Sequence, residues 1–347
     1  MKYTFFEIDA ESLFMDKPDV FASGLEAYLK DFKIDSGLIV KLECYLSVSN
    51  KDEYLTCYNT FYTSLSKSFK KQSPAAILIA QKPITNDGKA ILRITICDEE
   101  NVVVKHKQFQ KHPYTLIQIQ NELIIFSGGI AYDDANDTLR SVQGAYDFVE
   151  QLLDHEDMHF GQICHQWNYM ENIESKLTDP HTSWTNIQVV NEIRNLYFDP
   201  TLFKYGYPLQ SHIGINEGGF ITDFVASAKD GFATAQVKSS DQQITKAIYL
   251  PALNEVHIDS RRAELPDNAS LIEQTNAAIN ELNILLKDCD ITNGVVSDLK
   301  VFLRKKEDFE VVSTIIDEAW PAKNVIYLQA NAPDEGILIT IEGIIKG

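Results

Sequence analysis

The chain has 347 residues, is 44% hydrophobic and carries a formal net charge of −19 at pH 7. This length allows two or three domains with sizeable cores, and the acidity argues against a nucleic-acid partner because phosphates would be repelled. Five cysteines without a CxxC pair favour a reducing compartment over a disulfide framework. With neither a signal peptide nor a run of eighteen apolar residues, we expect a cytoplasmic protein with no membrane partner.

The first third of the chain predicts a short opening strand, two helices and three further strands. The opening segment is MKYTFFEID, and the next signal is a helix over GLEAYLKDF from Gly24. IVKLECYLSV from Ile39 then reads as a strand, and EYLTCYNTFYTSLSKSF from Glu53 as a second helix. Two apolar strands follow Pro74, and the polar stretch 98–111 predicts a connector or strand extension.

The middle third repeats this order with a longer opening. A hairpin is expected over TLIQIQNELIIFSGGIA from Thr115, followed by a helix over TLRSVQGAYDFVEQLL from Thr138. FGQICHQWNYMENI from Phe160 predicts a strand and SWTNIQVVNEIRNLYF a second helix. The segment from Leu209 to Ala226 predicts a closing hairpin that turns at NEGG from Asn216.

The last third repeats the order again. Residues 246–258 alternate as a half-buried strand would, and SLIEQTNAAINELNILLKDC from Ser270 carries a broad apolar helical stripe. A strand over VVSDLKVFLR from Val295 precedes a helix over EDFEVVSTIIDEAW from Glu307. Two strands after Pro321 close the unit.

The repetition predicts an α+β fold of three units, over residues 1–100, 112–230 and 240–347. Each unit is expected to form a mixed sheet with two helices on one face. The uncovered apolar faces must be buried, and packing them around a central axis gives an intramolecular pseudotrimer. Functional clefts are then expected between units.

The last unit resembles the Rid (YjgF) superfamily in EQTNAAINELNILLKDCDI, VSDLKVFLRKKEDF, PAKNV and ITIEGII, in that order. The middle unit, with FSGGIA, HQWNYMENI, EIRNLYF and YGYPLQSHIGINEGG, is similar to the chorismatases, a branch built from Rid-like units in one chain. The resemblance covers roughly Leu116 to the end and, more faintly, Leu25 to Ile96. It implies a hydrolase or lyase of secondary metabolism that splits chorismate into pyruvate and an aromatic or dihydroaromatic acid.

Splitting an enol ether requires a proton on its terminal methylene carbon, and a carboxylic acid held protonated in a mostly apolar site can supply it. Glu342 lies in the apolar stretch LITIEGII and, by the resemblance, matches the glutamate of the family's IEIE-type strand. We therefore predict Glu342 as the proton donor. The alternative interpretation places it on the exposed side of an alternating strand.

Chorismate carries two carboxylates, which call for cationic partners. The resemblance implies Arg304, Arg194 and Lys323 as these partners, although Arg194 is also explained as a surface residue paired with Glu192 or Asp199. Lys323 stands where Rid deaminases hold an arginine, and a lysine loses the planar fork of the guanidinium. An imine or enamine deaminase of the Rid type is therefore a second alternative function.

The predicted ring-binding residues are aromatic and amide side chains of the middle unit: Trp167, Asn168, Tyr169 and Tyr207. They are equally explained as core aromatics with a hydrogen-bonded amide. The chain departs from the chorismatase pattern where it has His165 in place of an arginine, Leu209 and Gln210 in place of small residues, and Asn331, Ala332 and Pro333 in place of a Cys-Arg pair.

These departures keep a catalytically inactive Rid-like protein open as the first alternative function, binding a small molecule or a Rid-like paralogue. For either function the expected ligand is a small carboxylated metabolite, and the expected state is a monomer or small oligomer. We predict no cofactor and no metal. The histidines of HEDMH, His155 to His159, end a helix and lack a third ligand nearby.

Overall fold

We describe the protein from a computed structural model. It describes the whole chain except residues 9, 71, 85–89, 120, 133–136, 177–183, 204–205, 229–233, 239–242, 261–264, 267, 289–294, 321–323 and 347. The first, second and third unit are named below in chain order, and each consists of one of the three sheets with its helices.

The first unit contains a four-stranded sheet of order β1-β5-β2-β3. Asn50 caps α3 by accepting a hydrogen bond from the Glu53 amide, 3.0 Å, and Pro18 occupies the first turn of α2. The elements are β1 (Lys2–Ile8), α1 (Glu11–Phe14), α2 (Pro18–Asp31), β2 (Ile39–Tyr45), α3 (Lys51–Phe69), β3 (Ala75–Ile79), β4 (Lys82–Pro83) and β5 (Ala90–Ile96).

The second unit has the strand path β11-β10-β12-β8-β7-β6. Asp137 caps α4, and Thr185 and Gln188 form a capping box at the start of α5. The elements are β6 (Val102–Phe109), β7 (His112–Ile119), β8 (Glu122–Phe126), β9 (Ile130–Ala131), α4 (Thr138–His155), β10 (Ile163–Glu171), α5 (Asn186–Tyr197), β11 (Leu209–Ile215) and β12 (Phe220–Ser227).

The third unit has the order β13-β14-β15-β18-β16-β17-β4, so the short strand β4 of the first unit completes its edge. The elements are β13 (Thr234–Lys238), β14 (Gln243–Leu250), β15 (Glu255–Ser260), α6 (Leu271–Asp288), β16 (Val295–Leu303), α7 (Phe309–Ala319), β17 (Asn324–Gln329) and β18 (Ile339–Lys346).

The three sheets share one topology, which confirms the predicted α+β fold of repeated units. The orders β1-β5-β2-β3, β8-β12-β10-β11 and β15-β18-β16-β17 correspond strand by strand. In each unit a β-bulge shifts the pairing near the start of the strand that lies in sequence between the two main helices. The shifts are between Ile39 and Lys41 in β2, between Ile163 and His165 in β10, and between Val296 and Asp298 in β16. A bulge re-aims the side chains that follow it, so the three units aim equivalent residues alike.

The predicted closing hairpin of the second unit is wrong. β11 and β12 follow each other in sequence, but β10 lies between them in the sheet. β10 pairs with β11 in parallel, Trp167 opposite Ser211, and with β12 antiparallel, Trp167 opposite Asp223. The helix α5 provides the crossover that a parallel pair requires, and the loop at NEGG spans a strand rather than forming a tight turn.

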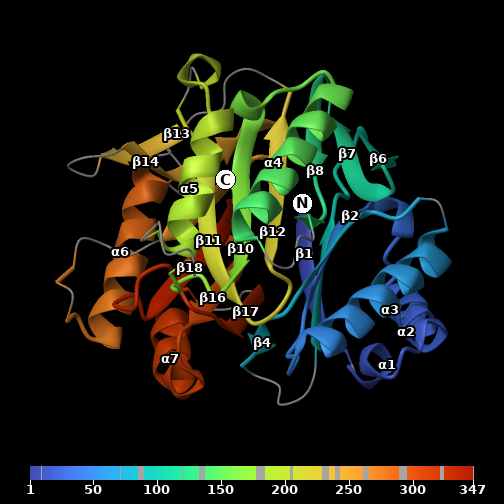
Figure 1. Cartoon of the computed structure of the whole chain (residues 1–347), viewed down its shortest axis with the longest axis horizontal. Helices are drawn as coiled ribbons and strands as arrows, with labels where there is room; N and C mark the ends of the chain where they lie inside the picture. The colour runs from blue at the N-terminus through green and yellow to red at the C-terminus, as the bar shows by residue number, and fades with distance from the viewer. Residues whose placement is uncertain are drawn as a thin grey trace.

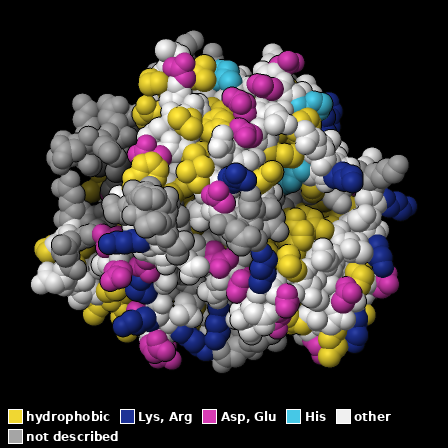
Figure 2. Space-filling model, in the orientation of Figure 1, with side chains coloured by type: hydrophobic (Ala, Val, Ile, Leu, Met, Phe, Trp, Pro, Cys, Tyr) yellow, Lys and Arg dark blue, Asp and Glu magenta, His cyan; other side chains and the backbone are white. Residues whose placement is uncertain are grey.

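The helices lie on the outside of the molecule and the sheets converge on its centre (Figure 1). α2 and α3 flank the first sheet, α4 and α5 the second, and α6 and α7 the third. On the face in Figure 2, acidic and basic side chains are interspersed, so the negative net charge does not form one continuous acidic patch there.

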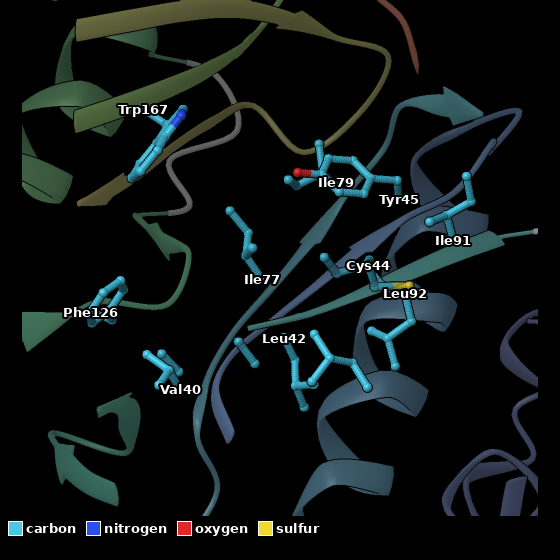
Figure 3. Close-up of a cluster of buried hydrophobic side chains, with 14 of the residues drawn as sticks. Val40, Leu42, Cys44, Tyr45, Ile77, Ile79, Ile91, Leu92, Phe126 and Trp167 are labelled. Atoms are coloured by element: carbon cyan, nitrogen blue, oxygen red, sulfur yellow. The ribbon is translucent and has the colours of Figure 1, made fainter. Parts of the chain in front are cut away.

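The sheets bury their second faces against one another. One hydrophobic cluster combines side chains from all three units, among them Leu42, Trp167 and Ile326. Figure 3 shows part of it, with Phe126 and Trp167 of the second unit beside the strands of the first. Backbone hydrogen bonds also cross the boundaries, from Gly129 to Ala76, 3.0 Å, and from Gly214 to Asn331, 2.8 Å.

Candidate active site on the axis of the three units

Charged side chains face the axis at equivalent positions of the three units. The strands β2, β10 and β16 contain the same pattern, because their bulges align them and side chains two residues apart share a face. One layer contains Lys41, His165 and Asp298, and the next contains Glu43, Trp167 and Lys300. The neighbouring strands β5, β12 and β18 add Arg93, Asp223 and Glu342, opposite Glu43, Trp167 and Lys300 respectively.

These layers surround a cavity in the middle of the molecule. The space open to the centre of a water-sized sphere is about 30 Å³, which is room for about two water molecules. Its wall takes residues from every unit, including Tyr3 of the first, Phe126 of the second and His257 of the third. The site therefore lies between units, as expected, but it lies on the common axis rather than in a cleft between two of them.

Two of the ion pairs at the axis join different units. Lys41 of the first unit pairs with Asp223 of the second. Arg93 of the first unit pairs with Asp298 of the third, with 2.7 Å between Nη2 and Oδ2, and also contacts Glu43. All five side chains are buried. Buried charges require such partners because moving an unpaired ion from water into the protein interior costs roughly several kcal/mol.

Two buried lysines approach the ring of Trp167. Lys41 Nζ lies 4.8 Å and Lys300 Nζ 5.0 Å from its centroid. Burial lowers the pKa of Lys41 to about 8, although its partner Asp223 acts in the opposite direction. Burial likewise lowers the pKa of Lys300. Both amines can therefore release a proton more readily than an exposed lysine.

Glu342 lies inside this cavity. It is 3% exposed, so the interpretation as a solvent-facing strand residue is wrong. Its Oε2 accepts a hydrogen bond from Trp167 Nε1, 3.0 Å, and lies 3.3 Å from Lys300 Nζ. Its Oε1 is buried and has no hydrogen-bond partner among the described residues. One oxygen is thus held in place while the other faces the cavity.

The predicted cationic partners lie elsewhere. Arg304 pairs with Glu174, 2.8 Å, and donates to backbone carbonyl groups of residues 334 and 337. Arg194 donates to Gln210 Oε1, 2.7 Å. Neither lines the cavity. Lys323 lies outside the described residues, and the carboxylate-binding role of all three remains a proposal.

The predicted ring-binding residues separate in the same way. Trp167 lines the cavity. Asn168 points to the opposite face of β10, where its Oδ1 accepts from Thr222, 2.9 Å. Tyr169 is buried one layer further along the axis-facing side, and Tyr207 is 38% exposed and stacks on Phe198. Trp167 is the member of this set that donates a hydrogen bond to Glu342.

Sequence reasoning missed most of the axis residues. Their signal was a charged residue at every second position of an otherwise apolar strand, as in Lys41-Leu42-Glu43 and Asp298-Leu299-Lys300. In a single strand this pattern also fits a solvent-exposed face. The signal becomes informative only when the equivalent strands are aligned with one another.

Within the described ranges, no group of three His, Cys, Asp or Glu residues could hold a metal ion. None of the helices that the structure describes is long and apolar enough to cross a membrane.

Comparison with solved structures places this arrangement among known folds. A crystal structure of a chorismatase matches 90% of this chain and 94% of its own, with a TM-score of 0.65 and 15% identity. The chain has the chorismatase fold. A cyanuric acid hydrolase from A. caulinodans covers 99% of the chain with a TM-score of 0.44 and 9% identity, and 98% of its own chain is covered.

Smaller proteins match about a third of this chain. A member of the YjgF protein family from Neisseria meningitidis covers 37% of this chain and 97% of its own, with a TM-score of 0.27 and 8% identity. No model of a protein family and no curated protein matches the sequence. The similarity to the chorismatase structure therefore establishes the fold. Evidence for an activity comes from the residues at the axis.

Proposed function

We propose that the axis cavity is the active site of a chorismatase-like enzyme, which cleaves the enolpyruvyl ether of chorismate to pyruvate and an aromatic or dihydroaromatic acid. The observation that carries the proposal is the geometry of Glu342. A buried carboxyl group has one oxygen fixed by Trp167 and Lys300, and its other oxygen faces the cavity without a partner among the described residues.

This geometry suits proton transfer to carbon. Glu342 Oε1 would deliver the proton to the methylene carbon, which turns the enol ether into an oxocarbenium ion. Lys300 Nζ lies 3.3 Å from the other oxygen, where its charge stabilises the carboxylate that is left after proton transfer. Trp167 keeps that group in one orientation, as a positioned acid requires.

Lys41, Arg93 and Lys300 are the cations available to a carboxylated substrate at the axis. Each already contacts an acidic side chain, and the cavity has room for about two water molecules. A ring substrate therefore requires these pairs to separate, with its carboxylates replacing Asp223, Asp298 or Glu43 as partners.

The same observation favours a second candidate. A cavity whose cations are satisfied by the chain's own acids is also what a catalytically inactive Rid-like protein would have, with the ions serving to join the units. In this case the protein binds a small molecule or a paralogue without turning over a substrate.

The deciding experiment follows pyruvate release from chorismate by coupling it to NADH oxidation. We expect release above the spontaneous rate, and a loss of about 100-fold or more in kcat for Glu342→Gln, which keeps the shape but not the acid. Glu335→Gln, an exposed change between the last two strands, is the control. Absence of pyruvate, or full activity in Glu342→Gln, would reject the enzyme. Chorismate binding without turnover would support the second candidate.

A further inference from the structure

A second polar atom in the cavity lacks a hydrogen-bond partner among the described residues, and it belongs to a histidine. His257 is buried on β15, lines the cavity and presents a buried Nε2 with no hydrogen bond. This atom lies 3.8 Å from Glu255 Oε2, which is beyond hydrogen-bond length. The wall of the cavity thus contains one carboxyl oxygen and one imidazole nitrogen that have no hydrogen-bond partner among the described residues.

His257 is the end of a chain of polar groups that crosses from the third unit to the second. Its Nδ1 lies 3.4 Å from Nδ1 of His165, and His165 Nε2 lies 3.2 Å from Ser211 Oγ. Ser211 Oγ in turn lies 3.2 Å from Asp259 Oδ2. His165 also stacks on Trp167, with 3.6 Å between ring centroids, which links the chain to the residue that holds Glu342.

Hydrogen-bond direction fixes where the protons in this chain are. An ionised carboxylate only accepts, so Ser211 donates to Asp259 and its oxygen accepts from His165 Nε2. The facing Nδ1 atoms of the two histidines have room for one proton between them. The neutral pair therefore leaves Nε2 of His257 as its one basic nitrogen, and the pair can bind a single additional proton at that atom.

The charged groups around the pair support a positive charge on it. Its own strand β15 supplies Glu255 and Asp259, and β10 supplies Trp167 beside His165. The adjacent strand β18 adds Glu342, and Tyr3 and the Met1 ammonium bond to Glu255. The other ions that line the cavity are Lys41, Glu43, Arg93, Asp298 and Lys300. Burial raises the pKa of Glu255, but His257 and the ammonium outweigh it and leave that pKa lowered, so Glu255 stays ionised.

We propose that His257, supported by His165, is the general base of the axis cavity and acts opposite the acid Glu342. This role rests on the proposed function, because it assigns the second proton transfer of the same site. Ser211, Asp259 and Glu255 are positioning residues. Ser211 and Asp259 fix the tautomer of His165, and the charge of Glu255, whose Oε2 lies 3.8 Å from Nε2 of His257, favours the imidazolium form of that residue.

The proton balance is as follows. Glu342 protonates the methylene carbon, and a water molecule adds to the resulting oxocarbenium carbon while His257 Nε2 takes one proton of that water. The hemiketal then breaks its bond to the ring oxygen. That oxygen receives the proton from His257, and the hemiketal hydroxyl proton passes to Glu342. One water is consumed, pyruvate and a ring alcohol leave, and both residues return to their starting states.

A titration of the full chain tests the histidine pair without any substrate. The protein is labelled with ¹⁵N-histidine, and the ring nitrogens are followed from about pH 5 to 9, the range around the ordinary histidine pKa. His165→Gln and His257→Gln assign the signals. We expect both residues to shift at one shared midpoint, with uptake of one proton by the pair and His165 Nε2 protonated throughout. Two independent imidazolium ions, or no titration of either residue, would overturn the proposal.

Kinetics provide the second readout. His257→Gln should lower kcat by about 100- to 10,000-fold with KM nearly unchanged, and should remove the loss of activity toward acid pH that protonation of a base causes. His155→Gln, at a histidine that is 49% exposed on α4, is the matched control. Full activity in His257→Gln would reject the base. If the unmodified protein releases no pyruvate, the proposed function fails, and the titration alone decides whether the pair shares one proton.

Discussion

At the scale of single residues, the axis depends on ions that have no access to bulk water. Arg93 contacts both Asp298 and Glu43, and each of the three side chains is buried. A buried pair adds little net stability compared with apolar residues of the same volume, but removing one partner leaves a charge unpaired. The effect of a substitution on stability therefore depends on whether it leaves a buried charge without a partner.

We predict that Arg93→Met destabilises the protein by about 3–5 kcal/mol, because two carboxylates lose their shared partner. The free energy of unfolding in guanidinium chloride measures this. Lys67→Met is the control: its partner Asp19 is exposed on α2, and such a pair contributes less than about 1 kcal/mol. Equal effects of the two substitutions would contradict the role of burial.

Lys41 gives a pH-dependent prediction. In the folded state its pKa is lowered from 10.5 to about 8 by burial, so between these values the unfolded chain binds a proton that the folded chain does not. The free energy of unfolding must then rise with pH across this window and gain nothing from Lys41 below it. We expect the difference between the unmodified protein and Lys41→Met to grow from pH 8 to pH 10.5 in denaturant titrations. A flat difference would argue against the lowered pKa.

At the scale of elements, the segment that follows β8 joins two units. Gly129 donates from its backbone to Ala76 of β3, and a Cβ on Gly128 would lie 2.4 Å from that same carbonyl oxygen. The Ala76 oxygen belongs to the backbone and cannot move aside as a flexible side chain could, so the two strands would have to separate. The glycine is thus required by the close approach of two backbones.

We predict that Gly128→Ala destabilises the protein by about 1–3 kcal/mol, the usual cost of forcing atoms into a packed interior. Gly24→Ala is the matched control, since its Cβ would meet no atom within 4 Å on α2 and alanine favours helix by roughly 1 kcal/mol. The two changes should shift the melting temperature in opposite directions. A neutral Gly128→Ala would show that the boundary between the units is loosely packed.

The elements themselves were largely predictable from the sequence, because helical stripes and capping residues such as Asp137 are local signals. The order of strands within a sheet was not, and β11 with β12 was misread as a hairpin because the intervening β10 comes from earlier in the chain. Of the site, Glu342 and Trp167 were predicted. Lys41, Arg93 and His257 were not, since their importance arises from strands of different units.

At the scale of the whole molecule, the units share one interior. The largest hydrophobic cluster contains residues from all three, and β4 of the first unit completes the sheet of the third. A unit on its own would expose apolar surface and unpaired charges on its axis-facing side. Folding of the units is therefore expected to be coupled.

We predict a single unfolding transition for the full chain. Fluorescence of Trp167, isolated in a Trp184→Phe/Trp320→Phe background, reports on the axis, and far-ultraviolet circular dichroism reports on the peripheral helices. The two denaturation curves should coincide. Separate midpoints would show that the units unfold independently of the interior they share.

The equivalent axis positions are filled by different residues in each unit, and this has a consequence for how such a molecule can be assembled. A trimer of three identical first units would bring three copies of Lys41 together without Asp223, and three copies of the third unit would do the same with Asp298 and without Arg93. Like charges at close range repel, and each assembly would lack the ion pairs that join the units of this chain. The three units are thus no longer interchangeable, and each has a single compatible place around the axis.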